Sequence, residues 1–192
     1  GNKKMKLKVL LLALTINLNG VVVSAKSASD LYGTLGVASV KSASSSYTVN
    51  SKNYTALLGY NLNSWLAVEA EVSRPFEDYK LSLPAGHTNK WNSSHNAVML
   101  KAQAKLTDSA PVLIHGRFGK AQFNWKEENT STSPSTNTNY NEQGFIYGIG
   151  VRLFLFENVS SRFDFTKFVP DNEAGSMTET NMFTIIPIIL SF

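Results

Sequence analysis

The side chains of this chain that could do covalent chemistry are few and far apart. A nucleophilic enzyme needs a serine, threonine or cysteine with a base within reach, but the sequence has no cysteine and three histidines. One serine, Ser94, stands directly before His95. Neighbouring residues of a strand point to opposite faces, so we interpret this pair as polar residues at a strand end. The sequence therefore predicts no catalytic residues and no enzyme.

Metal or cofactor chemistry has no better basis. Zinc and calcium sites need several cysteine, histidine or carboxylate ligands at close spacing, and the three histidines are scattered. Gly144, Gly148 and Gly150 fall within an alternating apolar segment, which is typical of a curved strand and not of a phosphate-binding loop. We expect no metal and no cofactor.

Another group of residues points to electrostatic chemistry. If the aliphatic faces of alternating segments meet lipid, the opposite faces bring ionisable side chains together. These are Glu69, Glu71, Lys101, Lys105, His115, Arg117, Arg152, Arg162 and Asp164. Buried charges are costly unless they are paired. We therefore predict that these side chains form an ion-pair network in the interior enclosed by the strands, the lumen, in place of a hydrophobic core. The alternative is a gated, weakly anion-preferring path, because Lys and Arg outnumber the acids in this set.

Strands with period-two alternation must position these residues. In the clearest segment, Leu66, Val68 and Ala70 fall on one face while Glu69 and Glu71 fall on the other, as in a strand with one apolar and one polar side. Strands of about ten residues suit a tilted membrane crossing. We predict eight strands, over 31–41, 52–62, 64–74, 95–107, 111–125, 143–157, 159–169 and 180–192.

The connections between these strands alternate in length. Short turns are predicted at 61–64, 107–111 and 157–158, and long polar loops at 42–51, 74–94, 126–142 and 170–179. An even number of strands with this alternation puts all turns at one rim and all loops at the other, as in outer-membrane barrels. The predicted fold is all-β: an eight-stranded antiparallel up-and-down transmembrane β-barrel.

The first 25 residues read as a signal peptide. Lysines precede the apolar stretch 9–14, and Ser24-Ala25 gives a small-residue cleavage site. The predicted division is a signal peptide at 1–25, in which Met5 is a candidate initiator, and a barrel domain at 26–192. The segment 1–25 holds four of the 18 basic residues and no acid, so the remaining 14 match the 14 acids. We therefore expect no nucleic-acid partner. The export signal and the predicted barrel together predict localisation in the Gram-negative outer membrane.

The export signal, eight amphipathic strands, polar loops and a last strand ending on Phe192 resemble the small outer-membrane barrels of the OmpA-transmembrane, OmpX and opacity-protein type. The resemblance implies a C-terminal signal for the barrel-assembly machinery. Its positions here are Phe192, Leu190, Ile188 and Ile186. Pro187 departs from the pattern and, because it lacks a backbone donor, predicts a local irregularity in the closing strand.

Two lipid-modifying enzymes have a similar architecture, and neither motif transfers. The lipid A deacylase family uses a His-x-Ser element, which no histidine of this chain provides. The palmitoyltransferase uses an Asp-Ser pair in an outer loop, whereas Asp108-Ser109 falls in a predicted periplasmic turn. A lipid-modifying enzyme remains an alternative function, as does a small-solute or ion channel.

The leading functional hypothesis is a non-enzymatic, monomeric barrel that holds surface loops for adhesion, virulence, host or envelope interaction, since loops carry function while the barrel positions them. Expected partners are outer-membrane lipid and lipopolysaccharide, the assembly machinery, and host surface or matrix components. Candidate loop contacts are Phe76, Tyr79, Trp91 and Tyr140. Aromatic residues expected at the membrane interfaces are Tyr32, Tyr54, Tyr60, Trp65, Trp125 and Tyr147.

A secreted lipocalin-like or avidin-like barrel is the rival fold. Such a barrel would turn its apolar faces inward, so that Leu66, Val68 and Leu100 would line a ligand pocket and the charged faces would lie outside. This rival gives no reason for the alternation of short turns and long loops or for the terminal Phe192.

Overall fold

The computed structural model of the protein describes residues 31–44, 48–82, 88–106, 111–129, 136–156, 159–171 and 178–191. The predicted signal peptide at 1–25 lies outside these residues, as does Phe192. Within the described ranges, no helix has the length and apolar character needed to cross a membrane.

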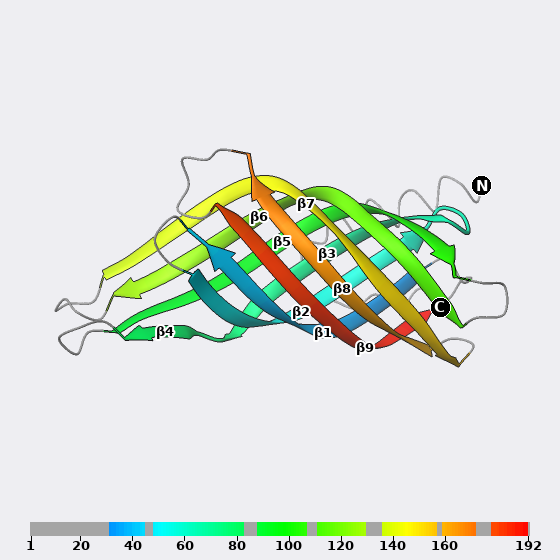
Figure 1. The fold of residues 1–192 in the computed structure, drawn as a ribbon, viewed down its shortest axis with the longest axis horizontal. Helices are drawn as coiled ribbons and strands as arrows, with labels where there is room; N and C mark the ends of the chain where they lie inside the picture. Colours follow the sequence, from blue (N-terminus) through cyan, green and yellow to red (C-terminus); the bar gives the residue numbers. More distant parts are fainter. Residues whose placement is uncertain are drawn as a thin grey trace.

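Nearly all of the described residues lie in strands, and Figure 1 shows these strands tilted in the same sense around one elongated body. The strands are β1 (Leu31–Ala43), β2 (Thr48–Asn61), β3 (Leu66–Glu77), β4 (Tyr79–Ser82), β5 (Thr88–Lys105), β6 (Val112–Asn129), β7 (Thr136–Phe156), β8 (Val159–Pro170) and β9 (Glu179–Ser191).

All neighbouring strands pair antiparallel, in the order β3-β2-β1-β9-β8-β7-β6-β5-β4. The sheet closes because β3 also pairs with β5, with Leu66 opposite Ala102 and Ser73 opposite His95. The short strand β4 continues that pairing beyond Asp78, with Tyr79 opposite Trp91. β3 and β4 therefore act as one interrupted strand of the barrel, which leaves eight strands around it. The closed antiparallel barrel of eight strands predicted from the sequence is confirmed.

The strands reach further into the long connections than the sequence predicted. β5 begins at Thr88 instead of residue 95, β6 ends at Asn129 instead of 125, and β7 begins at Thr136 instead of 143. These segments are rich in Asn, Ser and Thr, which are turn formers, but here they pair in continuous register with one another. Cross-strand pairing overrides their local preference.

The two faces of the barrel wall differ in chemistry. Large apolar side chains point outward: Leu100 is 52% exposed, and Phe118, Ile149 and Phe165 are exposed beside it on other strands. Charged side chains point inward, and Glu69 is 0% exposed. An apolar exterior around a polar interior is the arrangement of a transmembrane barrel. The lipocalin-like rival, which requires the opposite arrangement, is wrong.

The closing strand β9 carries the irregularity that Pro187 predicts. The register between β1 and β9 shifts between the pairs Leu35–Ile188 and Val37–Ile185, and the register between β8 and β9 shifts at the same height. Pro187 and its neighbour Ile188 are both exposed, as at a β-bulge.

This bulge changes which face each later residue occupies. Ile186 is buried at 1% exposure while Ile188 is 54% exposed. Ile186 and Ile188, two positions of the assembly signal that the resemblance implies, therefore lie on opposite faces of β9. The extra residue at Pro187 shifts the two-residue period by one position.

Candidate functional site

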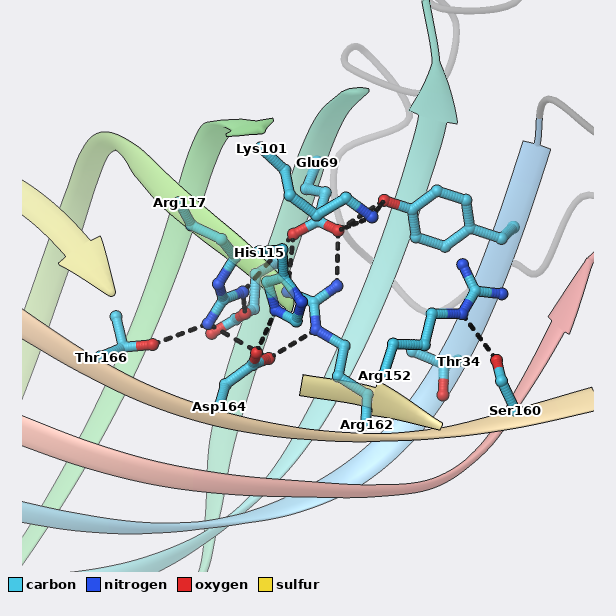
Figure 2. Close-up of polar contacts among 12 residues, drawn as sticks. Thr34, Glu69, Lys101, His115, Arg117, Arg152, Ser160, Arg162, Asp164 and Thr166 are labelled. Carbon is cyan, nitrogen blue, oxygen red and sulfur yellow. Dashed lines mark hydrogen bonds and ion pairs between the residues drawn. The ribbon is translucent and has the colours of Figure 1, made fainter. Parts of the chain in front are cut away.

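Ionisable side chains from five strands meet in the middle of the lumen (Figure 2). Period-two alternation aims them there, because each lies in phase with the other inward residues of its strand. They are Glu69 and Glu71 on β3, Lys101 on β5, His115 and Arg117 on β6, Arg152 on β7, and Arg162 and Asp164 on β8. All of them are buried.

Glu69 forms the centre of the first cluster. Its two carboxylate oxygens accept from Arg162, with Nη1–Oε1 at 2.5 Å and Nη2–Oε2 at 3.0 Å. Lys101 Nζ lies 3.2 Å from Oε1. The Tyr32 hydroxyl donates to the same oxygen at 2.5 Å and accepts from Lys101 Nζ at 2.6 Å. The contact between Glu69 and Arg162 is charge-assisted and bidentate, which makes it one of the strongest kinds of hydrogen-bonded contact in proteins.

Asp164 forms the centre of a second cluster. Oδ2 accepts from Arg162 Nε at 2.7 Å and lies 3.4 Å from Arg117 Nη2. Oδ1 lies 2.6 Å from His115 Nε2. Arg162 thus contacts both Asp164 and Glu69 and joins the two clusters (Figure 2).

Arg117 extends the network to Glu71 and toward the outer end. Its Nη1 donates to Glu71 Oε2 at 2.7 Å, and its Nη2 donates to Thr166 Oγ1 at 2.7 Å. The other oxygen of Glu71 lies 2.9 Å from His95 Nε2. Each of the three buried carboxylates therefore contacts at least two cationic or imidazole groups, which offsets the cost of removing its charge from water.

Lys105 does not join the network that the sequence assigned to it. It is the last residue of β5 and is exposed. At the end of a strand the barrel wall no longer encloses the inward position, so the side chain reaches water. The structure brings together the other assigned residues, with Arg152 at one side: its Nε donates to Ser160 Oγ at 2.7 Å, and its guanidinium lies over the Tyr32 ring.

Two members of the site were missed at the level of sequence. His95 is buried in the network, although it was interpreted as a polar residue of the rim. It stands six residues before Lys101, so the two-residue period could have placed both on the inward face. Tyr32 was assigned to a membrane interface but is buried over Gly59, its partner in register. A glycine opposite an aromatic residue leaves space for the ring.

An aromatic cluster lies in the lumen between the ion-pair network and the outer end. His95 stacks on Phe123 with centroids 4.5 Å apart, and Phe123 packs against Phe168 at 4.3 Å and Trp125 at 5.4 Å. Trp125 is buried and donates from Nε1 to Ser42 Oγ at 3.0 Å. Its assignment to a membrane interface is therefore wrong, because its side chain has the inward phase of β6.

The four candidate loop contacts lie on strands and not in loops. They are nearer the outer end than the exposed apolar side chains such as Leu100, Phe118 and Phe165, which we call the apolar belt. Trp91 is 3% exposed and stacks on Tyr140 with centroids 6.0 Å apart, so it is not free to meet an external partner. Tyr79 and Tyr140 pack partly buried against the aromatic cluster. Burial and the nearby Glu127 carboxylate raise the pKa of the Tyr140 phenol. Phe76 alone of the four is exposed, and it stacks on Tyr54 at 4.3 Å.

β5, β6 and β7 continue beyond the outer end of β8. The pairing of β7 with β8 stops at Gly144 opposite Pro170, whereas its pairing with β6 continues to Thr136 opposite Asn129. We call residues 88–96, 122–129 and 136–143 the outer sheet extension. Figure 1 shows these strands, with β4 beside β5, projecting past β1, β2, β8 and β9 at the end opposite the C-terminus.

The described residues contain no group of three or more His, Cys, Asp or Glu side chains arranged to hold a metal. His95 points inward while Ser94, its neighbour in β5, has the outward phase, so the two do not form a nucleophile–base pair. His87, Asp108 and Ser109 lie outside the described residues.

A closed barrel that is apolar outside and ion-paired inside defines the class of small transmembrane β-barrels. Over residues 9–185 the chain matches the model of the outer membrane protein beta-barrel domain. It belongs to this family, which places it in the outer membrane. No curated protein matches the chain by sequence.

Several solved structures share the fold. Ail, the attachment invasion locus protein of Yersinia pestis, in complex with the heparin analogue sucrose octasulfate, is 11% identical with a TM-score of 0.58, covering 84% of this chain and 97% of Ail. Neisserial surface protein A is 12% identical with a TM-score of 0.60, at 84% and 97% coverage. OprG from Pseudomonas aeruginosa is 14% identical with a TM-score of 0.57, at 86% and 96% coverage. At these identities the similarity shows the fold alone.

Proposed function

We propose that the protein is a closed, non-enzymatic barrel that holds its outer sheet extension and the adjoining loops at the cell surface for adhesion to a host surface or matrix. The observation that carries this proposal is the contrast between the lumen of the barrel and the outer end of its wall. The lumen is filled by paired charges and stacked rings, while the wall projects past the barrel on one side only.

The filled lumen supports a scaffold over a channel. An eight-stranded barrel is just wide enough for its own side chains, and here those side chains bind one another across it. Transport would require breaking contacts such as Glu69–Arg162 and Arg117–Glu71. The ion channel is therefore the weaker candidate, and the lipid-modifying enzyme is weaker still because the described residues offer no nucleophile–base pair of its kind.

The outer edge of β7 supports a binding role. Between Thr136 and Asn141 the strand pairs with β6 alone among the described residues, so its other side presents backbone donors and acceptors, as an edge strand does. The edge ends at Gln143, whose carbonyl oxygen accepts from Asp171 N at 2.8 Å. A partner in extended conformation can add to such an edge. Two proteins of the same fold carry surface roles in their names, the attachment invasion locus protein and Neisserial surface protein A, which agrees with this proposal.

Cells that display the protein test the proposal. In one variant a two-residue Asn-Gly turn replaces residues 127–138, which joins Lys126 to Asn139, a pair in register. The full protein is expected to increase binding to cultured epithelial cells and to immobilised heparin, and the shortened variant to lose that increase. A matched control replaces the inner turn Leu62–Trp65 in the same way and should bind fully. Equal binding by the shortened variant and the full protein, at equal surface display, would overturn the proposal.

A further inference from the structure

The outward face of the outer sheet extension is covered by side-chain amides. Directly below it, Val98, Phe118 and Phe145 are exposed as part of the apolar belt. Above them three rows of residues stand in register across β5, β6 and β7. These rows are Asn96–Gln122–Gln143, Ser94–Asn124–Asn141 and Asn92–Lys126–Asn139.

Two cations border these rows. Arg74 of β3 is exposed and donates from Nη2 to Asn96 Oδ1 at 3.0 Å. Lys126 is exposed in the third row. Neither of them is ion-paired with an acid within the described ranges, whereas other outward lysines near this height are, such as Lys120 with Asp171 at 2.9 Å. One acid also lies on this face, since Asp78 Oδ1 accepts from Asn92 Nδ2 at 3.0 Å. The rows therefore combine amides with two cations and one carboxylate.

The inward side of the same strands holds this face rigid. Trp91, Trp125 and Phe123 are buried behind it, and Tyr140 stacks on Trp91. Amides within the face are also linked, since Gln122 Nε2 donates to Asn141 Oδ1 at 2.9 Å. A preorganised surface loses little conformational entropy when it binds a ligand.

We propose that this face binds the phosphorylated saccharide headgroup of the outer-leaflet glycolipid, lipopolysaccharide. The order of apolar, charged and amide groups along the wall matches the order of acyl chains, phosphates and sugars in that molecule. The apolar belt at Val98 and Phe145 meets acyl chains, the guanidinium of Arg74 and the ammonium of Lys126 meet phosphates, and the amides meet sugar hydroxyls. Each amide both donates and accepts, as each hydroxyl does.

The lipid site goes beyond the proposed function, because it uses the face of the strands and not their edge or the loops. It is also separable by experiment. The variant in which a turn replaces residues 127–138 keeps Lys126, Asn139 and the rows below them, so it should lose adhesion and still bind the glycolipid.

Binding of the purified protein in detergent micelles to three probes tests the inference: lipopolysaccharide, lipid A and phosphatidylglycerol. The wild-type protein should prefer lipopolysaccharide to phosphatidylglycerol, which has a phosphate but no saccharide. Lys126→Gln should weaken binding to lipopolysaccharide by roughly tenfold, since a hydrogen bond to a charged group contributes on that order, and the double variant with Arg74→Gln should weaken it further. Folding of each variant is checked by its heat-modifiable migration on a gel.

Lys41→Gln is the matched control. Lys41 is an exposed cation on β1, four strands from β6 in the barrel order, and its loss should leave binding unchanged. Replacing Asn124 and Asn141 by Ala should weaken binding to lipopolysaccharide more than binding to phosphatidylglycerol. The inference is overturned if Lys41→Gln weakens binding as much as Lys126→Gln, if the double variant binds like the wild type, or if the wild type binds phosphatidylglycerol equally well.

Discussion

Glu69 and Arg162 bind each other across the full width of the barrel. Their strands, β3 and β8, are four steps apart in either direction around the closed sheet, yet both carboxylate oxygens accept from the guanidinium, at 2.5 and 3.0 Å. Both side chains are buried, and Arg162 also reaches Asp164 at 2.7 Å. Opposite walls of the barrel are therefore joined through its centre, as a hydrophobic core joins the elements of a soluble domain.

The first prediction concerns the stability of this contact. Glu69→Gln should lower the free energy of unfolding by about 3–5 kcal/mol, because it leaves the charges of Arg162 and Lys101 buried without their main partner. Urea unfolding in detergent micelles measures the change. The double variant Glu69→Gln with Arg162→Met should lose less stability than the sum of the losses in the two single variants, since it removes both charges of the pair.

An exposed pair provides the comparison. Lys52 and Glu77 are 2.6 Å apart on the outside of the barrel, with side chains more than half exposed. Lys52→Gln should change stability by no more than about 1 kcal/mol, because solvent screens such pairs. If Glu69→Gln and Lys52→Gln had equal effects, the lumen network would not be a core.

The second prediction concerns conductance. In planar lipid bilayers the wild-type protein should give no discrete current steps, because the network and the aromatic cluster fill the lumen. Replacing Arg117, Glu71 and His95 together by Ala removes the contacts that connect the ion pairs to the aromatic layer, and this variant should give small steps. Regular steps from the wild-type protein would contradict a closed barrel and favour the channel hypothesis.

Much of the barrel could be predicted because its wall follows one simple rule. Residues two apart share a face, so the inward positions of Glu69, Glu71, Arg162 and Asp164 follow from the apolar residues between them. The rule held along unbroken strands except at Lys105, where β5 and the enclosing wall end. It also applies to His95, which is in phase with Lys101, but His95 was interpreted as a polar residue at the end of the predicted strand 95–107.

The remaining features depend on pairing that no single segment contains. The strand pairs Asn89–Asn129 and Glu127–Thr138 join polar segments of different strands, and each segment alone resembles a loop. The burial of Tyr32 depends on Gly59, which stands opposite it on another strand. The contacts of Glu69 with Arg162 depend on closure of the whole barrel. These are tertiary effects, and local composition does not encode them.

The third prediction tests the space that Gly59 leaves. A Cβ atom at residue 59 would overlap the ring of Tyr32, whose hydroxyl bonds to Glu69 and Lys101. Gly59→Ala should therefore displace the ring and cost about 1–3 kcal/mol, as overpacking does. Gly116→Ala is the control, because its Cβ would meet only the Gly148 carbonyl oxygen at 3.9 Å. The control should be neutral or slightly stabilising in urea unfolding, and an equal loss in both variants would refute the role of Gly59.

The fourth prediction concerns the bulge at Pro187. Because the bulge puts both Pro187 and Ile188 on the outside, deleting Pro187 should restore simple alternation, with Ile186 and Ile189 still inward and Ile188 outward. This variant should fold. Deleting Thr184 instead moves every later residue of β9 to the wrong face and turns the buried Ile186 outward, so that variant should fail to fold.

Refolding into detergent micelles, followed by heat-modifiable migration on a gel, measures the folded fraction of both deletion variants. The two proteins have the same length, so a difference between them reports the phase of the strand and not its shortening. Loss of folding on deletion of Pro187 would mean that the bulge itself is required at the seam, where Gly36 and Ser161 lie against it: a Cβ at Gly36 would meet the Ile185 carbonyl oxygen at 2.6 Å, and Ser161 Oγ donates to the Pro187 carbonyl oxygen at 2.6 Å. Folding at the wild-type level would instead show that alternation, and not the bulge, specifies how the last strand closes the barrel.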